Sequence, residues 1–136
     1  MALGEVVAED KGQVTGMRVL STDESGTEIE VSLSSAGTIC GVASTSMWTY
    51  TQVIRPDGSI RGSGRGITTT SEGDVIHLIG NGSGKAAAPG ETTEFRVFIQ
   101  PYSASQKYCE FNTIGWVGEF AVAGDGTTVG TFWAWK

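Results

Sequence analysis

The sequence predicts an all-β protein, a single antiparallel meander that closes into a β-barrel of about eight strands with one short helix. Two glycine rows are the main observation. Glycine or an aliphatic residue occupies every second position over 60–66 and again over 76–84. Alternate residues of a strand share one face, whereas a helix would scatter these glycines and lose about 1 kcal/mol at each. Glycine rows in adjacent strands are typical of a strongly curved sheet.

The last strand is the second observation. Residues 127–136 contain Phe132, Trp133 and Trp135, and an apolar edge strand of this kind promotes aggregation when it has no partner. Closing the sheet would pair this edge. A barrel of eight strands has an interior that is either filled by side chains or holds one small ligand.

Alternating or β-rich runs predict the individual strands. The run over 27–35 is the clearest, because aliphatic and polar residues alternate strictly there. We expect the first strand region to be broken near Lys11-Gly12, and Ala36-Gly37 to form a turn. The predicted strands span residues 3–20, 27–35, 38–54, 59–70, 74–85, 92–101, 114–123 and 127–136.

Turn residues separate these runs. In Pro56-Asp57-Gly58, Pro fixes φ, Asp bonds its own backbone and Gly accepts a left-handed conformation. Ser71-Glu72-Gly73 and Gly124-Asp125-Gly126 also fit hairpin turns. The segment 102–112 predicts the short helix, with a capping box formed by Ser103 and Gln106 and with Asn112 at its end.

Composition limits the possible functions. The 136 residues suit one domain, 1–136, and the net charge of −6 argues against nucleic-acid binding. No run of 18 apolar residues suggests a membrane span, and residues 1–11 do not resemble a secretory signal. We therefore expect a cytoplasmic protein in which Cys40 and Cys109 are buried free thiols.

Five segments spread along the whole chain resemble a family of small, mostly uncharacterised prokaryotic all-β proteins. At the level of fold, the pattern is similar to barrels of the allene oxide cyclase and dirigent type. Those barrels bind apolar molecules and some steer cyclisations, but the resemblance assigns no catalytic residue here. The segments are 11–20 (KGQVTGMRVL), Arg55-Pro56-Asp57-Gly58 with the glycine strand behind it, 105–107 (SQK), Glu119-Phe120 and 132–136 (FWAWK).

Charged residues at mid-strand positions are the candidate site. If they face the interior, His77 and Glu119 are candidates for proton transfer, and an arginine would hold an oxyanion or carboxylate. If they face outward they are solvated surface groups, and the sequence leaves the choice open. The candidate ligand-binding residues are Arg61, Arg65, Arg96, Trp48 and Tyr50.

No cofactor or metal site is predicted. Residues 80–85 (GNGSGK) lack the spacing and the following helix of a phosphate-binding loop. His77 is the single histidine, and the cysteines and carboxylates show no spacing known from zinc sites.

The preferred function is binding of a small apolar or amphipathic molecule inside the barrel. The alternatives are an isomerase or cyclase acting on such a molecule, and a structural module with a filled barrel. We also expect a homo-oligomer in which the flat glycine face packs on a second copy. That packing would turn His77, Arg61 and Arg65 inward.

Overall fold

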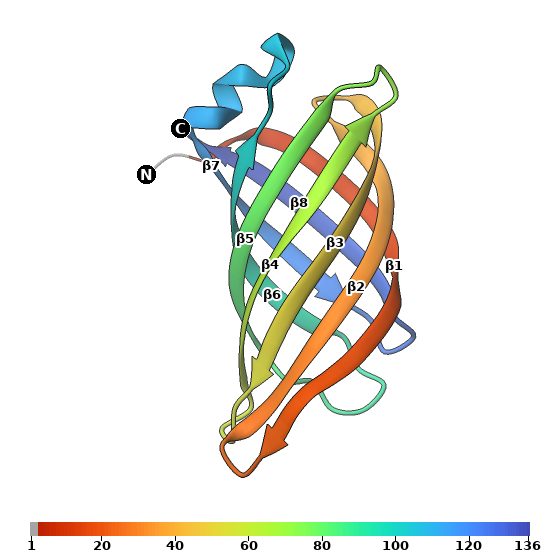
Figure 1. The fold of residues 1–136 in the computed structure, drawn as a ribbon, viewed down its shortest axis with the longest axis vertical. Coiled ribbons are helices and arrows are strands. Elements are labelled where there is room, and N and C mark those ends of the chain that lie inside the picture. The colour runs from red at the N-terminus through yellow and green to blue at the C-terminus, as the bar shows by residue number, and fades with distance from the viewer. Residues whose placement is uncertain (1–2) are drawn as a thin grey trace.

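Each strand pairs antiparallel with the next strand in the chain, and the last strand returns to the first, so the predicted closed barrel is confirmed. The structure is a computed structural model, and it describes residues 3–136 (Figure 1). The elements are β1 (Leu3–Asp23), β2 (Gly26–Ile39), β3 (Val42–Ile54), β4 (Ser59–Thr70), β5 (Val75–Lys85), β6 (Thr93–Tyr102), the 3-10 helix η1 (Gln106–Thr113), β7 (Gly115–Val122) and β8 (Thr127–Trp135).

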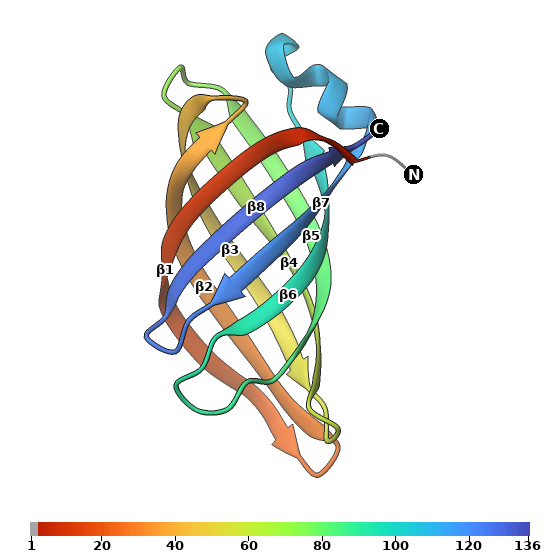
Figure 2. The same ribbon diagram turned by 180° about the vertical axis from the view of Figure 1, so that it is seen from behind.

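The closing pair is β1 and β8, which lie side by side in Figure 2. Ala8 is opposite Phe132, and the pairing ends with Gln13 opposite Thr127. Beyond Gln13, β1 continues to Asp23 and pairs with β2 alone, with irregular register near residues 15 and 20. The β1–β2 hairpin therefore extends below the closed part of the barrel.

Three of the tight turns contain the same hydrogen-bond pattern, in which an Asp side chain bonds the residue two positions ahead. The carboxylates of Asp57 and Asp125 each accept a hydrogen bond from the backbone N–H two residues ahead, at 2.9 and 3.0 Å, and another from the hydroxyl of that residue. Asp23 does the same in the β1–β2 turn. These bonds replace the backbone partners that a turn leaves unused. The hairpins predicted around 56–58, 71–73 and 124–126 are confirmed.

Two of the predicted boundaries are wrong. Ala36 and Gly37 lie inside β2, and the turn that follows uses Cys40 and Gly41, with φ of 48° and 79°. Two positive φ angles in a two-residue loop match the right-handed twist of a hairpin, and Gly tolerates them best. The break expected near Lys11 is also absent, because β1 runs through it.

The helix η1 packs against the upper end of the barrel in Figure 1. Its buried residues Tyr108 and Phe111 stack on each other and join the core around Trp116. The predicted capping box does not form. Instead, Asn112 brackets the backbone of Ser103, accepting from its N–H at 2.8 Å and donating to its carbonyl at 3.0 Å.

Further polar contacts fix this helix over the β4–β5 turn. The Ser103 hydroxyl donates to the carbonyl of Val75 at 2.7 Å, and the Ser105 hydroxyl donates to Asp74 at 2.7 Å. Ser103 is 1% exposed, so its hydrogen bond is shielded from water. The connection between β6 and β7 is therefore a fixed part of the upper end.

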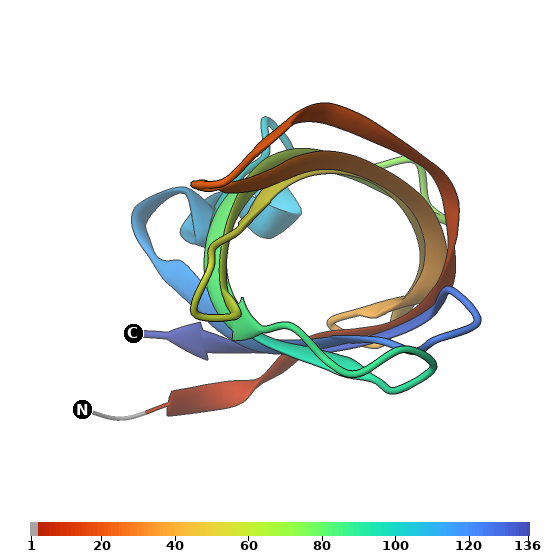
Figure 3. The same ribbon diagram turned by 90° about the horizontal axis from the view of Figure 1, so that it is seen from below.

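The glycine rows face the interior of the barrel, which is seen end-on in Figure 3. A Cβ at Gly66 would come within 2.5 Å of the Trp48 ring, and one at Gly118 within 2.3 Å of the Phe132 ring. Aromatic rings thus lie flat on neighbouring glycine backbone, which is a recognised way to cover glycine in a sheet. The expectation that this face packs on a second copy is wrong, since it lines the barrel.

Both thiols are free, as predicted, but they are exposed rather than buried. Cys40 lies in the β2–β3 turn and Cys109 on η1. Within residues 3–136, none of the helical structure has the length and apolar character needed to cross a bilayer.

Candidate functional site

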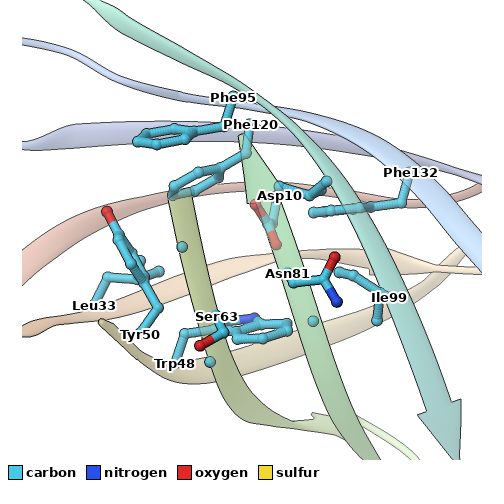
Figure 4. A pocket seen from close by; sticks show the side chains of 15 residues that line it. Asp10, Leu33, Trp48, Tyr50, Ser63, Asn81, Phe95, Ile99, Phe120 and Phe132 are labelled. Carbon is cyan, nitrogen blue, oxygen red and sulfur yellow. The ribbon is translucent and has the colours of Figure 1, made fainter. Parts of the chain in front are cut away.

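The lower half of the barrel contains a cavity of about 80 Å³. Roughly 10–15 Å³ suffices for one water molecule, so this space admits a ligand of several atoms. Figure 4 shows the residues that line it, which come from all eight strands. The lining residues are Asp10, Leu33, Trp48, Tyr50, Gly62, Ser63, Gly64, Gly80, Asn81, Gly82, Phe95, Val97, Ile99, Phe120 and Phe132.

Three aromatic rings form a cluster at the lower end of this cavity. Tyr50 meets Phe95 and Phe120 edge-on, with ring centroids 6.4 and 6.2 Å apart, and Phe95 lies 6.0 Å from Phe120. These separations fall in the favourable range for aromatic pairs. Trp48 and Phe132 border the same space. The cavity therefore presents ring faces and ring edges to a ligand.

The glycines explain why space remains there. On β4 and β5, Gly62, Gly64, Gly80 and Gly82 occupy inward positions where other strands carry large side chains. Only one atom, the Thr51 carbonyl oxygen at 3.6 Å, would lie within 4 Å of a Cβ at Gly62. One wall of the cavity is thus bare backbone.

Asp10 is the one carboxyl side chain directed into this apolar space, among the described residues that line it. It lies against β8, because a Cβ at Gly130 would be 2.8 Å from its Oδ1. Burial raises the pKa of Asp10 to about 6, since an ionised carboxylate loses its hydration there. The nearby Ser35 hydroxyl partly offsets this rise, although the two side chains make no hydrogen bond of standard geometry.

Two further hydroxyls border the same region. Ser35 and Thr128 are register partners of Gly12, on β2 and β8, two residues along β1 from Asp10. They are 7% and 1% exposed, and neither hydroxyl has a hydrogen-bond partner among residues 3–136. A buried polar atom without a partner is costly, so this cluster favours contact with a polar group.

Tyr50 is the other titratable side chain in the cavity. Burial raises the pKa of its phenol to about 12, so it is neutral at ordinary pH and keeps its O–H as a hydrogen-bond donor. Its ring forms part of the aromatic cluster, so Tyr50 offers both apolar contact and one polar atom.

A smaller cavity of about 20 Å³ lies above Trp48 and Phe132, toward η1. It shares Asp10 with the larger cavity, and its polar wall includes Ser46 and Thr68, whose hydroxyls are hydrogen bonded at 2.7 Å. It has room for about one water-sized group. Asp10 thus stands at the junction of an aromatic chamber and a narrower polar one.

Two of the residues predicted for the site line the cavity, namely Trp48 and Tyr50. The others are exposed on the outer face of the barrel. Of the two facings that the sequence left open, the outward one is therefore observed, and the inward turn of His77, Arg61 and Arg65 that packing on a second copy would cause does not occur. The reason is strand alternation: the glycine rows take the inward positions of β4 and β5, which leaves their neighbours outside. The outward residues are Arg61, Arg65, Arg96, His77 and Glu119.

Sequence reasoning missed Asp10, Phe95, Phe120 and Phe132 as cavity residues. Asp10 stands between Glu9 and Lys11 in the sequence, and such a charged triplet is typical of a solvated stretch. A signal was present, because Ala8, Asp10 and Gly12 alternate with exposed residues in a strand that has to close the barrel.

The arrangement does not favour a metal. Within residues 3–136, no three His, Cys, Asp or Glu side chains are grouped closely enough to hold an ion. Asp10 therefore acts as a single carboxyl group, available for a hydrogen bond, an ion pair or a proton transfer.

No known protein family and no curated protein matches this chain. Solved structures do match its fold. A protein of unknown function from Clostridium acetobutylicum ATCC 824 superposes with a TM-score of 0.87 at 17% identity, over 100% of both chains. A protein of unknown function from Rhodopseudomonas palustris gives a TM-score of 0.79 at 14% identity, over 99% of both chains.

A third similar structure is an enzyme from Penicillium herquei, with a TM-score of 0.67 at 14% identity, covering 98% of this chain and 96% of that one. At these identities the likeness establishes the β-barrel fold alone, and the chemistry has to be argued from the cavity.

Proposed function

We propose that this protein binds a small apolar or amphipathic molecule inside the lower half of its barrel. The observation that carries the proposal is the aromatic cavity whose opposite wall is glycine backbone. A filled-barrel structural module is disfavoured, because a cavity of about 80 Å³ leaves the lower half of the barrel interior unfilled.

The test uses a small aromatic probe and one substitution that fills the space. Toluene, titrated calorimetrically into the wild type, is expected to bind with a Kd of about 1 mM or tighter. Gly62→Leu would place its side chain into the cavity without a close backbone contact, and is expected to abolish the heat of binding.

Two variants control for this result. Gly16→Leu makes the same exchange at a site where a Cβ meets nothing within 4 Å, outside the cavity. Arg65→Ala removes an exposed cation from the outer face of the same strand as Gly62. Both are expected to bind toluene as the wild type does. Absence of toluene binding to the wild type would overturn the proposal.

An isomerase or cyclase remains the second candidate, and Asp10 is the observation that favours it. A carboxyl group with a pKa of about 6 in an apolar chamber suits general acid–base catalysis near neutral pH. This candidate requires turnover that Asp10→Asn removes without closing the cavity.

Homo-oligomerisation and a cytoplasmic location stay predictions. The inward glycine face no longer supports an oligomer, but the outer face carries exposed apolar side chains such as Met47, Ile79 and Tyr102. Sedimentation equilibrium measures the oligomeric state directly.

A further inference from the structure

The charge of Asp10 inside the cavity has no cationic partner among the residues that the structure describes. All nine lysine and arginine side chains are exposed. The described residues that line the two cavities include none of them. An ionised carboxylate in an apolar site needs an opposite charge or several hydrogen bonds. Among residues 3–136, Asp10 has no cation beside it in the cavity, and the nearby Ser35 hydroxyl makes no hydrogen bond of standard geometry, so these residues leave the requirement unmet.

The aromatic rings point to the nature of the missing partner. Cations are attracted to the faces of Trp, Tyr and Phe rings within about 6 Å, and cages of such rings recognise ammonium groups. Trp48, Tyr50, Phe95, Phe120 and Phe132 enclose the same space that Asp10 enters. A carboxylate beside aromatic rings is complementary to an organic cation and offers less to a neutral hydrocarbon.

We propose, on the basis of the proposed small-molecule site, that its ligand is a hydrophobic cation, an amine or quaternary ammonium compound whose charged group pairs with Asp10 while its apolar part occupies the aromatic chamber. The net charge of −6 also favours the approach of a cation. The hydroxyls of Ser35 and Thr128, which have no hydrogen-bond partner among residues 3–136, lie beside Asp10 on the neighbouring strands and leave the cation as the partner that the cavity itself can offer its carboxylate.

The groups that face Asp10 determine whether any other residue makes ligand binding depend on pH. From β2 these are Ser35 and Gly37, and from β8 they are Thr128 and Gly130, all of them uncharged. Across the cavity Tyr50 remains neutral. Binding of a permanently charged ligand therefore follows the ionisation of Asp10 alone, and is expected to weaken as pH falls through about 6.

The experiment compares three probes of similar size by calorimetry: benzylammonium, which carries its charge at both pH values used, benzyl alcohol and toluene. At about pH 8 we expect the cation to bind the wild type roughly tenfold or more tightly than toluene does. In Asp10→Asn, which keeps the size of the side chain, the three probes are expected to bind with similar affinity. In the wild type at about pH 5 the advantage of the cation is expected to disappear.

The outcomes separate this inference from the proposed function. Equal binding of all three probes to the wild type would overturn the inference and leave the apolar site standing. Absence of binding by all three would overturn both. A cation preference that persists in Asp10→Asn, or in the wild type at about pH 5, would overturn the assignment to Asp10. If Asp10→Asn does not fold, the pH titration of the wild type provides the same decision.

Discussion

The upper and lower halves of the barrel interior are built from the same strands but are filled differently. Above Trp48, inward side chains from opposite strands meet one another and the rings of η1, forming the buried core. Below it, β4 and β5 contribute glycine, and the rings of neighbouring strands lie along the wall. The core residues are Val7, Ile39, Ile76, Leu78, Ile99, Tyr108, Phe111, Trp116, Phe132 and Ala134.

This difference shows how a narrow eight-stranded barrel keeps a cavity. Side chains normally fill a barrel of this size. Here the Trp48 ring lies over Gly66 on the next strand, and its far edge is near Gly80. A ring that covers the adjacent backbone does not extend across the lumen. The space that can hold a ligand therefore lies in the lower half, below the cluster of core residues around Trp116.

The largest expected effect contrasts one phenylalanine from each half. Phe111 is 4% exposed and packs edge-on against Trp116, with ring centroids 5.1 Å apart, so Phe111→Ala is expected to destabilise by about 3–5 kcal/mol. Phe120 already borders a cavity, so Phe120→Ala is expected to cost roughly 1–2 kcal/mol. Urea unfolding measures both losses, and equal values would contradict the division of the interior.

The next effect concerns Asp10 and has a defined pH dependence. Its native pKa of about 6 lies above the ordinary value of 3.8, so the folded protein binds this proton more tightly than the unfolded chain does. Its contribution to stability is therefore fully present below about pH 4 and is lost as pH rises through about 6. Asp10→Asn is expected to stabilise by about 2–3 kcal/mol at about pH 8 and by little at about pH 4.

Asp57 is the matched control, because its pKa is lowered in the folded protein, whereas that of Asp10 is raised. Hydrogen bonds from the Ser59 side chain and backbone hold the pKa of this exposed carboxyl below its usual range. Its stabilisation is present above the unfolded pKa and is lost in acid. Asp57→Asn is expected to destabilise at about pH 8. Urea unfolding at both pH values checks the pair, and the same sign for both variants would show that burial does not govern Asp10.

The sequence predicts the fold better than the site, for a physical reason. The two glycine rows show that alternate residues of each strand lie on one face and that the sheet curves strongly there. The turns around Asp57 and Asp125 show which strands are neighbours. These features are local. Which face turns inward depends on the closure of β1 on β8, and neither Arg61 nor His77 carries a local signal of that choice.

Asp10 was missed for a related reason. Its environment is created by Gly130 and Phe132, more than a hundred residues away in the chain, so only the closed barrel makes the carboxyl buried. Trp48 and Tyr50 were found because aromatic residues in a β-rich run belong inside under most arrangements of the sheet.

The last prediction tests the glycine wall itself, using two positions one step apart on the inner face of β4. A Cβ at Gly64 would come within 2.5 Å of the Tyr50 Cβ and 2.6 Å of the Thr49 carbonyl, so Gly64→Val forces the backbone to shift. We expect it to destabilise by roughly 1–3 kcal/mol. The side chain added by Gly62→Val would occupy open space, and valine also favours strands. We therefore expect this substitution to lower the free energy of unfolding by less than about 1 kcal/mol.

Thermal unfolding compares the stability of the two variants, and the toluene titration compares their affinity for the probe. Gly62→Val is expected to keep its stability and lose affinity, which would assign Gly62 to the site. Gly64→Val is expected to lose stability, because close approach of β3 requires glycine there. A wild-type melting temperature for Gly64→Val would show that the neighbouring backbone of β3 accommodates an added side chain without loss of stability. The glycine row would then serve to leave the chamber open, and close packing against β3 would not explain it.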